Sequence, residues 1–163
     1  MKLIPEWFNH QYCLIAWPCN KDLYGDIINK ARDEVANVIN EISKTERVIV
    51  LSNKEDINEI ENKTNHENID ILECKLDDSW MRDIAPIFYN EDKKLKSISF
   101  DFNGYGKYPD YVNDNKISKF ISNHLNIPTK NSDLVIEGGA ITYDDRKNLF
   151  STKNVLFNKN RKQ

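Results

Sequence analysis

The sequence predicts an α/β fold, and two observations carry this prediction. Short apolar runs such as "YCLIAWP" (12–18) and "RVIVLS" (47–52) have the length and composition of buried strands. Between these two runs, apolar residues recur at steps of three and four over about residues 26–43, which is the period of an amphipathic helix. A chain of 163 residues, of which 39% are hydrophobic, is long enough to bury one core. We therefore interpret residues 1–163 as one domain of alternating strands and helices.

The predicted elements follow one another without a linker or a low-complexity segment. The helix over about 26–43 should cover a sheet with its apolar face. Ser52 and Glu55 have the spacing of a capping box, which predicts a second helix that continues to about residue 63. The apolar face of the first helix consists of Ile28, Ala31, Val35, Val38 and Ile42. The remaining elements are strands at 69–74, 84–89 and 95–102, a helix at about 114–125 with Ile117, Phe120, Ile121 and Leu125 inward, and apolar segments at 133–139 and 154–158.

Two parts of the chain resemble each other in outline. Residues of about 10–75 and about 80–140 have comparable lengths, and both show a strand, strand, helix, strand order. A fixed succession of elements that occurs twice is typical of a repeated supersecondary unit. The sequence therefore suggests an internal repeat.

Composition and charge exclude several classes of protein. A net charge of -3, with lysines scattered along the chain, gives no basic patch for a nucleic acid. No apolar run approaches 18 residues, and the N-terminus has no long apolar stretch with a cleavage site, so we expect no membrane segment and a cytoplasmic location. Cys13, Cys19 and Cys74 are odd in number and lack zinc-ligand spacing. Cys13, inside a predicted strand, is interpreted as a small apolar residue rather than a nucleophile.

The segment "DDSWMRDIAP" (77–86) concentrates charge where the backbone should enter the core. It lies between a strand expected to end near Leu76 and another expected to start near Ile84, and loops at strand ends often carry function. Trp80 adds a flat apolar face among the carboxylates. This combination suits a ligand that is cationic and either planar or alkyl-stemmed.

Two other interpretations of this segment stay open. The cluster could be a solvated turn in which Arg82 pairs with a neighbouring aspartate. It could also be a divalent-metal site made from Asp77, Asp78 and Asp83, although a cation among the acids, Arg82, disfavours a metal. A further candidate, Glu137, follows an apolar run and precedes two glycines, which let the backbone and a ligand approach closely.

Taken in order, these segments resemble one known family. It is the agmatine deiminase and bacterial peptidylarginine deiminase family, within the guanidino-group-modifying (pentein) superfamily. The most specific match is "DDSWMRD", in which carboxylate, aromatic, arginine and carboxylate stand at the family's offsets, and the agmatine deiminase branch looks closer. The matching segments are "IPEWFNHQYCLIAWP", "DDSWMRDIAP", "FNGYGKYPDY", "DLVIEGGAI" and "VLFNKNRK".

The resemblance implies a fold and a reaction. The fold is a pentein-type five-bladed α/β propeller of ββαβ modules, of which this chain would form about the first half. In the family, a cysteine thiolate attacks the guanidinium carbon of the substrate, ammonia leaves after protonation by a histidine, and water releases the ureido product. Agmatine would give N-carbamoylputrescine and ammonia, a step toward putrescine, and peptidyl-arginine is the alternative substrate. The resemblance implies no metal and no organic cofactor.

The resemblance also assigns roles to residues of the site. Asp83 and Glu137 would be the carboxylates that hold a guanidinium, because such oxygens both orient its N–H groups and neutralise its charge. Trp80 would pack along the substrate, and Asp78 would support the site. Arg82 would be structural and pair with a local acid, since a free cation would repel the substrate.

The chain departs from the family in one respect that matters for activity. Members are about twice as long, and their nucleophilic cysteine and His-x-Asp pair lie in a second half that has no counterpart here. His10, His66 and His124 lack the family's sequence context. We therefore expect residues 1–163 to be the N-terminal part of a truncated agmatine deiminase-like catalytic domain, inactive on its own. A non-catalytic guanidine-binding or interaction fragment is the alternative.

Overall fold

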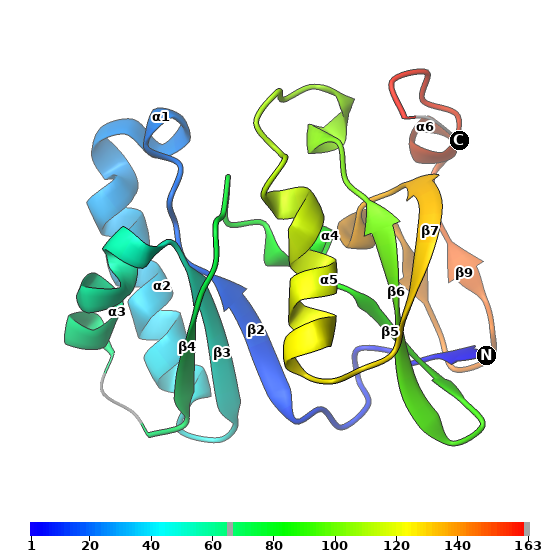
Figure 1. The fold of residues 1–163 in the computed structure, drawn as a ribbon, viewed down its shortest axis with the longest axis horizontal. Coiled ribbons are helices and arrows are strands. Elements are labelled where there is room, and N and C mark those ends of the chain that lie inside the picture. Colours follow the sequence, from blue (N-terminus) through cyan, green and yellow to red (C-terminus); the bar gives the residue numbers. More distant parts are fainter. Residues whose placement is uncertain (65–66, 162–163) are drawn as a thin grey trace. The chain divides into compact units, whose positions relative to one another are not determined.

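A computed structural model describes residues 1–64 and 67–161, and it confirms the α/β class. The chain forms two compact units. One consists of Asn9–Met81, called here the 9–81 unit, and the other joins Met1–Phe8 to Arg82–Gln163 and is called the 82–163 unit. Figure 1 shows the elements of both units.

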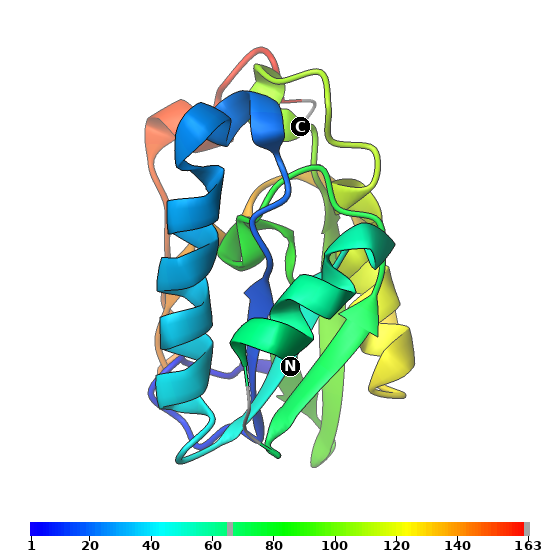
Figure 2. The ribbon, with the colours of Figure 1, turned by 90° about the vertical axis from the view of Figure 1, so that its left-hand side faces the viewer.

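The 9–81 unit is a parallel sheet covered by helices on one face. Its three strands are ordered β2-β3-β4, and both neighbouring pairs are parallel. Helices α2 and α3 lie on the face of this sheet that is turned toward the viewer in Figure 2. The elements are β2 (Tyr12–Ala16), α1 (Lys21–Tyr24), η1 (Gly25–Ile27), α2 (Ile28–Ile42), β3 (Arg47–Ser52), η2 (Lys54–Asp56), α3 (Ile57–Lys63) and β4 (Ile69–Glu73).

The core of this unit forms around its central strand. In β3 every residue after Arg47 is buried, and this strand has a parallel neighbour on either side. Trp17, Ile39 and Ile60 are fully buried and pack with Val48 in one cluster. The apolar runs of the sequence therefore predicted these strands correctly.

The buried face of α2 matches the prediction in part. Val35 and Ile42 pack against the core, whereas Val38, predicted to face inward, is 51% exposed, and Arg32 is only 6% exposed. The helix is turned so that the Arg32 guanidinium lies inside: its Nε donates to the carbonyl oxygen of Pro18 at 3.0 Å, and the group pairs with Asp56 and Glu59. Such a buried ion network needs partners that are distant in sequence, so apolar spacing alone did not predict that an arginine faces inward.

The predicted capping box is also wrong. Ser52 is the last residue of β3, and its hydroxyl donates to the carbonyl oxygen of Asn53 at 2.9 Å instead of capping a helix. A short 3-10 turn, η2, intervenes before α3, whose N-cap residue makes no side-chain capping bond. The helix itself exists and ends at Lys63, as predicted.

The 82–163 unit is built on a mixed sheet with the order β1-β5-β6-β7. Strands β6 and β7 are parallel, and the other neighbouring pairs are antiparallel. Helix α5 connects β6 to β7 and packs against β6. The elements are β1 (Lys2–Leu3), α4 (Met81–Ile84), β5 (Ile87–Glu91), β6 (Lys94–Asp101), η3 (Gly104–Gly106), α5 (Asp114–His124), β7 (Thr129–Val135), η4 (Gly138–Ala140), β8 (Thr142–Tyr143), β9 (Leu149–Phe150) and α6 (Lys153–Leu156).

The predicted element order holds for one part of the suggested repeat only. Within about 80–140, strands β5 and β6, helix α5 and strand β7 follow the strand, strand, helix, strand order. Within about 10–75 the order is strand, helix, strand, helix, strand. The strand predicted from residue 84 begins at Ile87, because the helical turn α4 and Pro86 precede it. Residues 154–158 lie mostly in α6.

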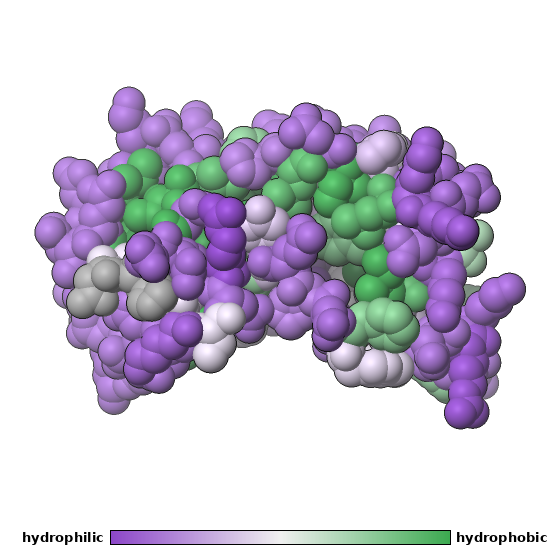
Figure 3. All heavy atoms as spheres, turned by 90° about the horizontal axis from the view of Figure 1, so that it is seen from below, coloured by the Kyte–Doolittle hydropathy of each residue, from purple (hydrophilic) through white to green (hydrophobic). Residues whose placement is uncertain are grey.

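The face of the molecule that is seen from below the view of Figure 1 carries hydrophilic side chains with apolar ones among them (Figure 3). In the 82–163 unit the most exposed large apolar side chains are Trp7, Phe150 and Phe157. Among the described helices, none combines the length and the apolar character that crossing a membrane requires.

Candidate functional site

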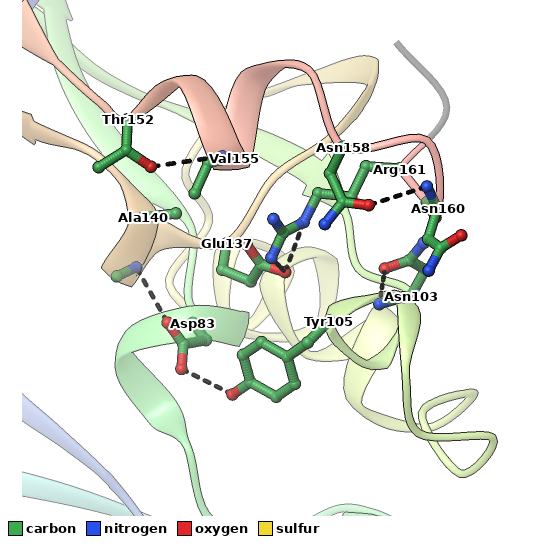
Figure 4. A network of polar contacts seen from close by, with 12 residues as sticks. Asp83, Asn103, Tyr105, Glu137, Ala140, Thr152, Val155, Asn158, Asn160 and Arg161 are labelled. Atoms are coloured by element: carbon green, nitrogen blue, oxygen red, sulfur yellow. Dashed lines mark hydrogen bonds and ion pairs between the residues drawn. The ribbon is translucent and has the colours of Figure 1, made fainter.

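Four segments of the 82–163 unit meet around two carboxylates. They are helix α4, turn η3, the residues that follow β7, and the segment 158–161 (Figure 4). Each belongs to one of the sequence segments singled out above. Long-range side-chain hydrogen bonds join them: Asp83 reaches Tyr105 and Gly139, and Arg161 reaches Glu137.

Asp83 is held from two directions. Its Oδ2 accepts a hydrogen bond from the Tyr105 hydroxyl at 2.7 Å, and its Oδ1 accepts one from the backbone N–H of Gly139 at 3.0 Å. Each carboxylate oxygen has two lone pairs, so both oxygens retain acceptor capacity after these two bonds. The carboxylate is therefore oriented in advance and still able to accept N–H groups of a ligand.

The turn that carries Tyr105 has an unusual backbone. Gly104, Tyr105 and Gly106 have φ values of +63°, +62° and +67°, which is the left-handed region. Glycine adopts this region freely, whereas a bulky residue there costs about 1–3 kcal/mol. The Tyr105 ring packs edge-on against Phe102 at 5.1 Å between centroids. The strained turn therefore holds the Tyr105 hydroxyl against the carboxylate of Asp83.

The two glycines after Glu137 are required by space. A Cβ atom on Gly139 would lie 2.2 Å from Oδ1 of Asp83, and one on Gly138 would lie 2.4 Å from the backbone oxygen of Arg82. Both glycines let the chain pass directly beside α4, which is the close approach that the sequence indicated. Their contact is what brings the Asp83 and Glu137 segments together.

Glu137 is deeply buried and already paired. It is 2% exposed, and its Oε1 accepts from Arg161 through Nε at 3.2 Å and Nη2 at 2.7 Å. The Arg161 side chain is 10% exposed. This partner was not predicted from the sequence, although Arg161 lies in the "VLFNKNRK" segment. Two N–H groups of the Arg161 guanidinium therefore meet one oxygen of the Glu137 carboxylate.

A small cavity opens beside Asp83 within the same unit. Its walls combine apolar rings with acids, and the buried Ser118 hydroxyl that lines it has no hydrogen-bond partner among the described residues. The cavity has room for about one water molecule, so it is a recess beside the carboxylate rather than a complete ligand pocket. The lining includes Asp83, Phe100, Phe102, Asp114, Ser118 and Ile136.

Trp80 and Asp78, the other two predicted site residues, belong to the 9–81 unit. Trp80 is 53% exposed. Burial raises the pKa of Asp78, while hydrogen bonds from the Ser79 backbone and from the Trp80 side chain oppose that rise. The structure brings Asp83 and Glu137 into one unit, and the part that Trp80 and Asp78 play stays a prediction.

Arg82 pairs with an acid, but not with the neighbouring aspartate considered in the sequence analysis. Its guanidinium pairs with Glu6, and its Nη2 lies 3.5 Å from the carbonyl oxygen of Ile141. The acid is therefore far away in sequence rather than a neighbouring aspartate. Among the described residues, no three His, Cys, Asp or Glu side chains group to hold a metal ion, so the metal site considered for Asp77, Asp78 and Asp83 has no support.

Cys13, His10 and His124 are described residues of the types that could serve as a nucleophile or an acid. Cys13 lies in β2, as predicted, and burial together with the charge of Glu46 raises the pKa of its thiol. A thiolate nucleophile requires the opposite shift. His10 pairs with Glu46, and His124 is the last residue of α5. His66 lies outside the described residues.

Comparison with known proteins identifies the family. The model of the Porphyromonas-type peptidyl-arginine deiminases matches residues 2–163. The chain belongs to this family. A protein of Mycoplasma capricolum, provisionally named an agmatine deiminase, is 33% identical over 162 residues, which are 96% of this chain and 44% of that protein. The chain thus spans less than half the length of this relative.

Solved structures show the same fold. The agmatine deiminase of Enterococcus faecalis superimposes with a TM-score of 0.91 at 20% identity, over 98% of this chain and 46% of that one. A C. jejuni agmatine deiminase with substrate bound superimposes with a TM-score of 0.87 at 24% identity, over 98% and 48% of the two chains. The chain therefore has the pentein fold of the agmatine deiminases and covers about half of it, as the resemblance implied.

Proposed function

We propose that this chain binds the guanidinium group of a small cationic substrate, as part of an agmatine deiminase-like hydrolase of the guanidinium C–N bond. One observation carries the proposal: Asp83 is fixed by Tyr105 and by Gly139 beside a small cavity that has both polar and apolar walls. A guanidinium is planar, permanently charged and rich in N–H donors. An oriented carboxylate with free lone pairs is the acceptor that such a group needs.

The proposed site has two carboxylates and two supporting residues. Asp83 would accept N–H groups of the guanidinium, and Glu137, in the adjacent segment, would be the second carboxylate. Trp80 would cover the stem or the guanidinium plane through a cation–π contact, and Asp78 would support it. The assignment of Trp80 and Asp78 rests on their motif positions.

Turnover needs groups that the described residues do not arrange. A deiminase of this type attacks the guanidinium carbon with a thiolate and protonates the leaving ammonia. The thiol of Cys13 has a raised pKa, which argues against a nucleophilic role. We propose that this chain on its own releases no ammonia from agmatine, and that catalysis requires a cysteine and a histidine from elsewhere.

Agmatine is the preferred candidate for the substrate. The relative from Mycoplasma capricolum and both solved structures carry the name agmatine deiminase, which favours conversion to N-carbamoylputrescine, a step toward putrescine. The family model carries the name peptidyl-arginine deiminase, so a blocked arginine peptide is the second candidate. Parallel titrations with the two compounds rank them.

Calorimetric titration of the 163-residue chain tests the proposal. Agmatine should bind and putrescine, which has an amine in place of the guanidinium, should bind far more weakly. Asp83→Asn keeps the shape and removes the charge, so affinity for agmatine should fall at least ~100-fold, or about 2.7 kcal/mol. Asp77→Asn is the matched control from the same acidic cluster and should cost far less. Equal small losses in the two variants, or equal binding of agmatine and putrescine, would contradict the proposal.

A further inference from the structure

The guanidinium of Arg161 already occupies part of the proposed site. Nε and Nη2 of Arg161 both point to one oxygen of Glu137, Oε1, at 3.2 and 2.7 Å (Figure 4). Within residues 1–64 and 67–161, no side chain or backbone N–H is seen to donate to the other oxygen, Oε2. The carboxylate therefore has one oxygen committed to the chain's own guanidinium.

Burial makes this pair mutually dependent. Glu137 and Arg161 have side chains that are 3% and 10% exposed, and a buried ion that loses its partner is strongly destabilising. The negative charge of Glu137 is balanced by Arg161. Asp83 differs from Glu137 in this respect. Among the described residues, the hydrogen bonds to Asp83 come from the neutral Tyr105 hydroxyl and Gly139 N–H, so no cation at hydrogen-bonding distance balances its charge.

One turn ties Arg161 to the rest of the site. Asn103 accepts from the N–H of Gly106 at 2.8 Å through Oδ1, and its Nδ2 donates to the carbonyl oxygen of Asn160 at 2.8 Å. A Cβ atom on Gly106 would lie 2.7 Å from Cβ of Asn160, so the two segments are in close contact. The turn that places Tyr105 on Asp83 therefore also places the residue before Arg161.

We infer that Arg161 is a positioning residue of the guanidinium site. Its guanidinium fixes the orientation of Glu137 and balances its charge, so that Asp83 supplies the charge for a bound guanidinium and Glu137 offers Oε2 as an acceptor. The part of this inference that concerns ligand binding rests on the proposed function. The Arg161–Glu137 pair itself is independent of any ligand.

Chemical rescue tests the pair in the full 163-residue chain. Arg161→Ala removes two methylenes and the guanidinium, and it should lower Tm by about 10 °C because Glu137 is left buried without a partner. Millimolar ethylguanidinium should raise the Tm of this variant by mass action, whereas ethylammonium, with the same charge and stem, should not. The wild type and the Glu137→Gln, Arg161→Ala double variant should show no such difference. Equal effects of the two cations on Arg161→Ala would overturn the inference.

Refolding keeps the test decisive if Arg161→Ala does not fold by itself. Recovery of folded protein with ethylguanidinium and not with ethylammonium then supports the pair, and equal yields contradict it.

Arg161→Lys provides the conservative variant: it keeps the charge but cannot place two coplanar N–H groups on one oxygen. It should restore most of the stability but bind agmatine at least ~5-fold more weakly than the wild type, since Glu137 is less firmly oriented. An unchanged agmatine affinity in Arg161→Lys would contradict the positioning role.

The two proposals can fail separately. If the wild type does not bind agmatine, the proposed function fails, while the rescue of Arg161→Ala still reports on the pair with Glu137. If the wild type binds agmatine and the rescue is absent, the inference about Arg161 fails alone.

Discussion

Gly139→Ala is a one-methyl change that acts directly on Asp83. The added Cβ would lie 2.2 Å from Oδ1, whereas a C···O contact needs about 3.3 Å. The carboxylate must therefore retreat by about 1 Å, which breaks its hydrogen bond to the Gly139 N–H. A hydrogen bond to a charged group contributes about 1.5–3 kcal/mol, so we expect the free energy of unfolding to fall by that amount. Agmatine affinity should fall at least ~10-fold, because the acceptor is turned away.

A double-mutant cycle isolates the contact with Asp83. Urea denaturation gives the free energy of unfolding for the wild type, Gly139→Ala, Asp83→Ala and the double variant. In the Asp83→Ala background the methyl has room, so Gly139→Ala should cost less than about 0.5 kcal/mol. The same large cost in both backgrounds would show that the methyl clashes with something else. No cost in the wild-type background would show that the carboxylate is not held against Gly139.

Two further predictions concern Tyr105 and Asp78. Tyr105→Phe removes the hydroxyl that donates to Asp83 and should weaken agmatine binding about 5- to 10-fold in calorimetry. Tyr108 packs edge-on against the Tyr105 ring, and Tyr108→Phe should change the agmatine affinity less than about 2-fold. An equal loss of affinity in both variants would refute the role of the Tyr105 hydroxyl. Burial raises the pKa of Asp78, so ionisation of this carboxyl destabilises the fold at pH values above its raised pKa. As the pH falls below the ordinary pKa of 3.8, the carboxyl is protonated in both the folded and the unfolded state, and this destabilisation disappears. Asp78→Asn should therefore melt higher than the wild type at pH 7 and show no such gain below pH 3.8; a gain that is independent of pH would contradict this origin.

Much of the fold was predictable because it follows from periodicity. Strand β3 is a continuous apolar run, and α5 buries Ile117 and Ile121 at the predicted positions. In α2 the inward position of Arg32 was not predictable, although Val35 and Ile42 pack against the core as expected. Arg32 can face inward only because Asp56 and Glu59 meet it in space, and local spacing carries no record of that contact.

The two candidate acids could be recognised in the sequence, but the residues that they contact could not. Asp83 and Glu137 stand at recognisable positions of their motifs. Tyr105 and Arg161 are 22 and 24 residues away from these acids in sequence, so only the fold reveals which acid each one contacts. A signal for Tyr105 existed in the two flanking glycines, since "GYG" permits a left-handed turn. No comparable local pattern marks Arg161.

A crystal structure of the 163-residue chain with agmatine tests guanidinium binding at Asp83 most directly. We predict that guanidinium nitrogens of agmatine lie about 2.7–3.0 Å from the oxygens of Asp83, with Arg161 still bound to Oε1 of Glu137. Agmatine bound elsewhere, with the Asp83 carboxylate making only its bonds to Tyr105 and Gly139, would contradict the assignment.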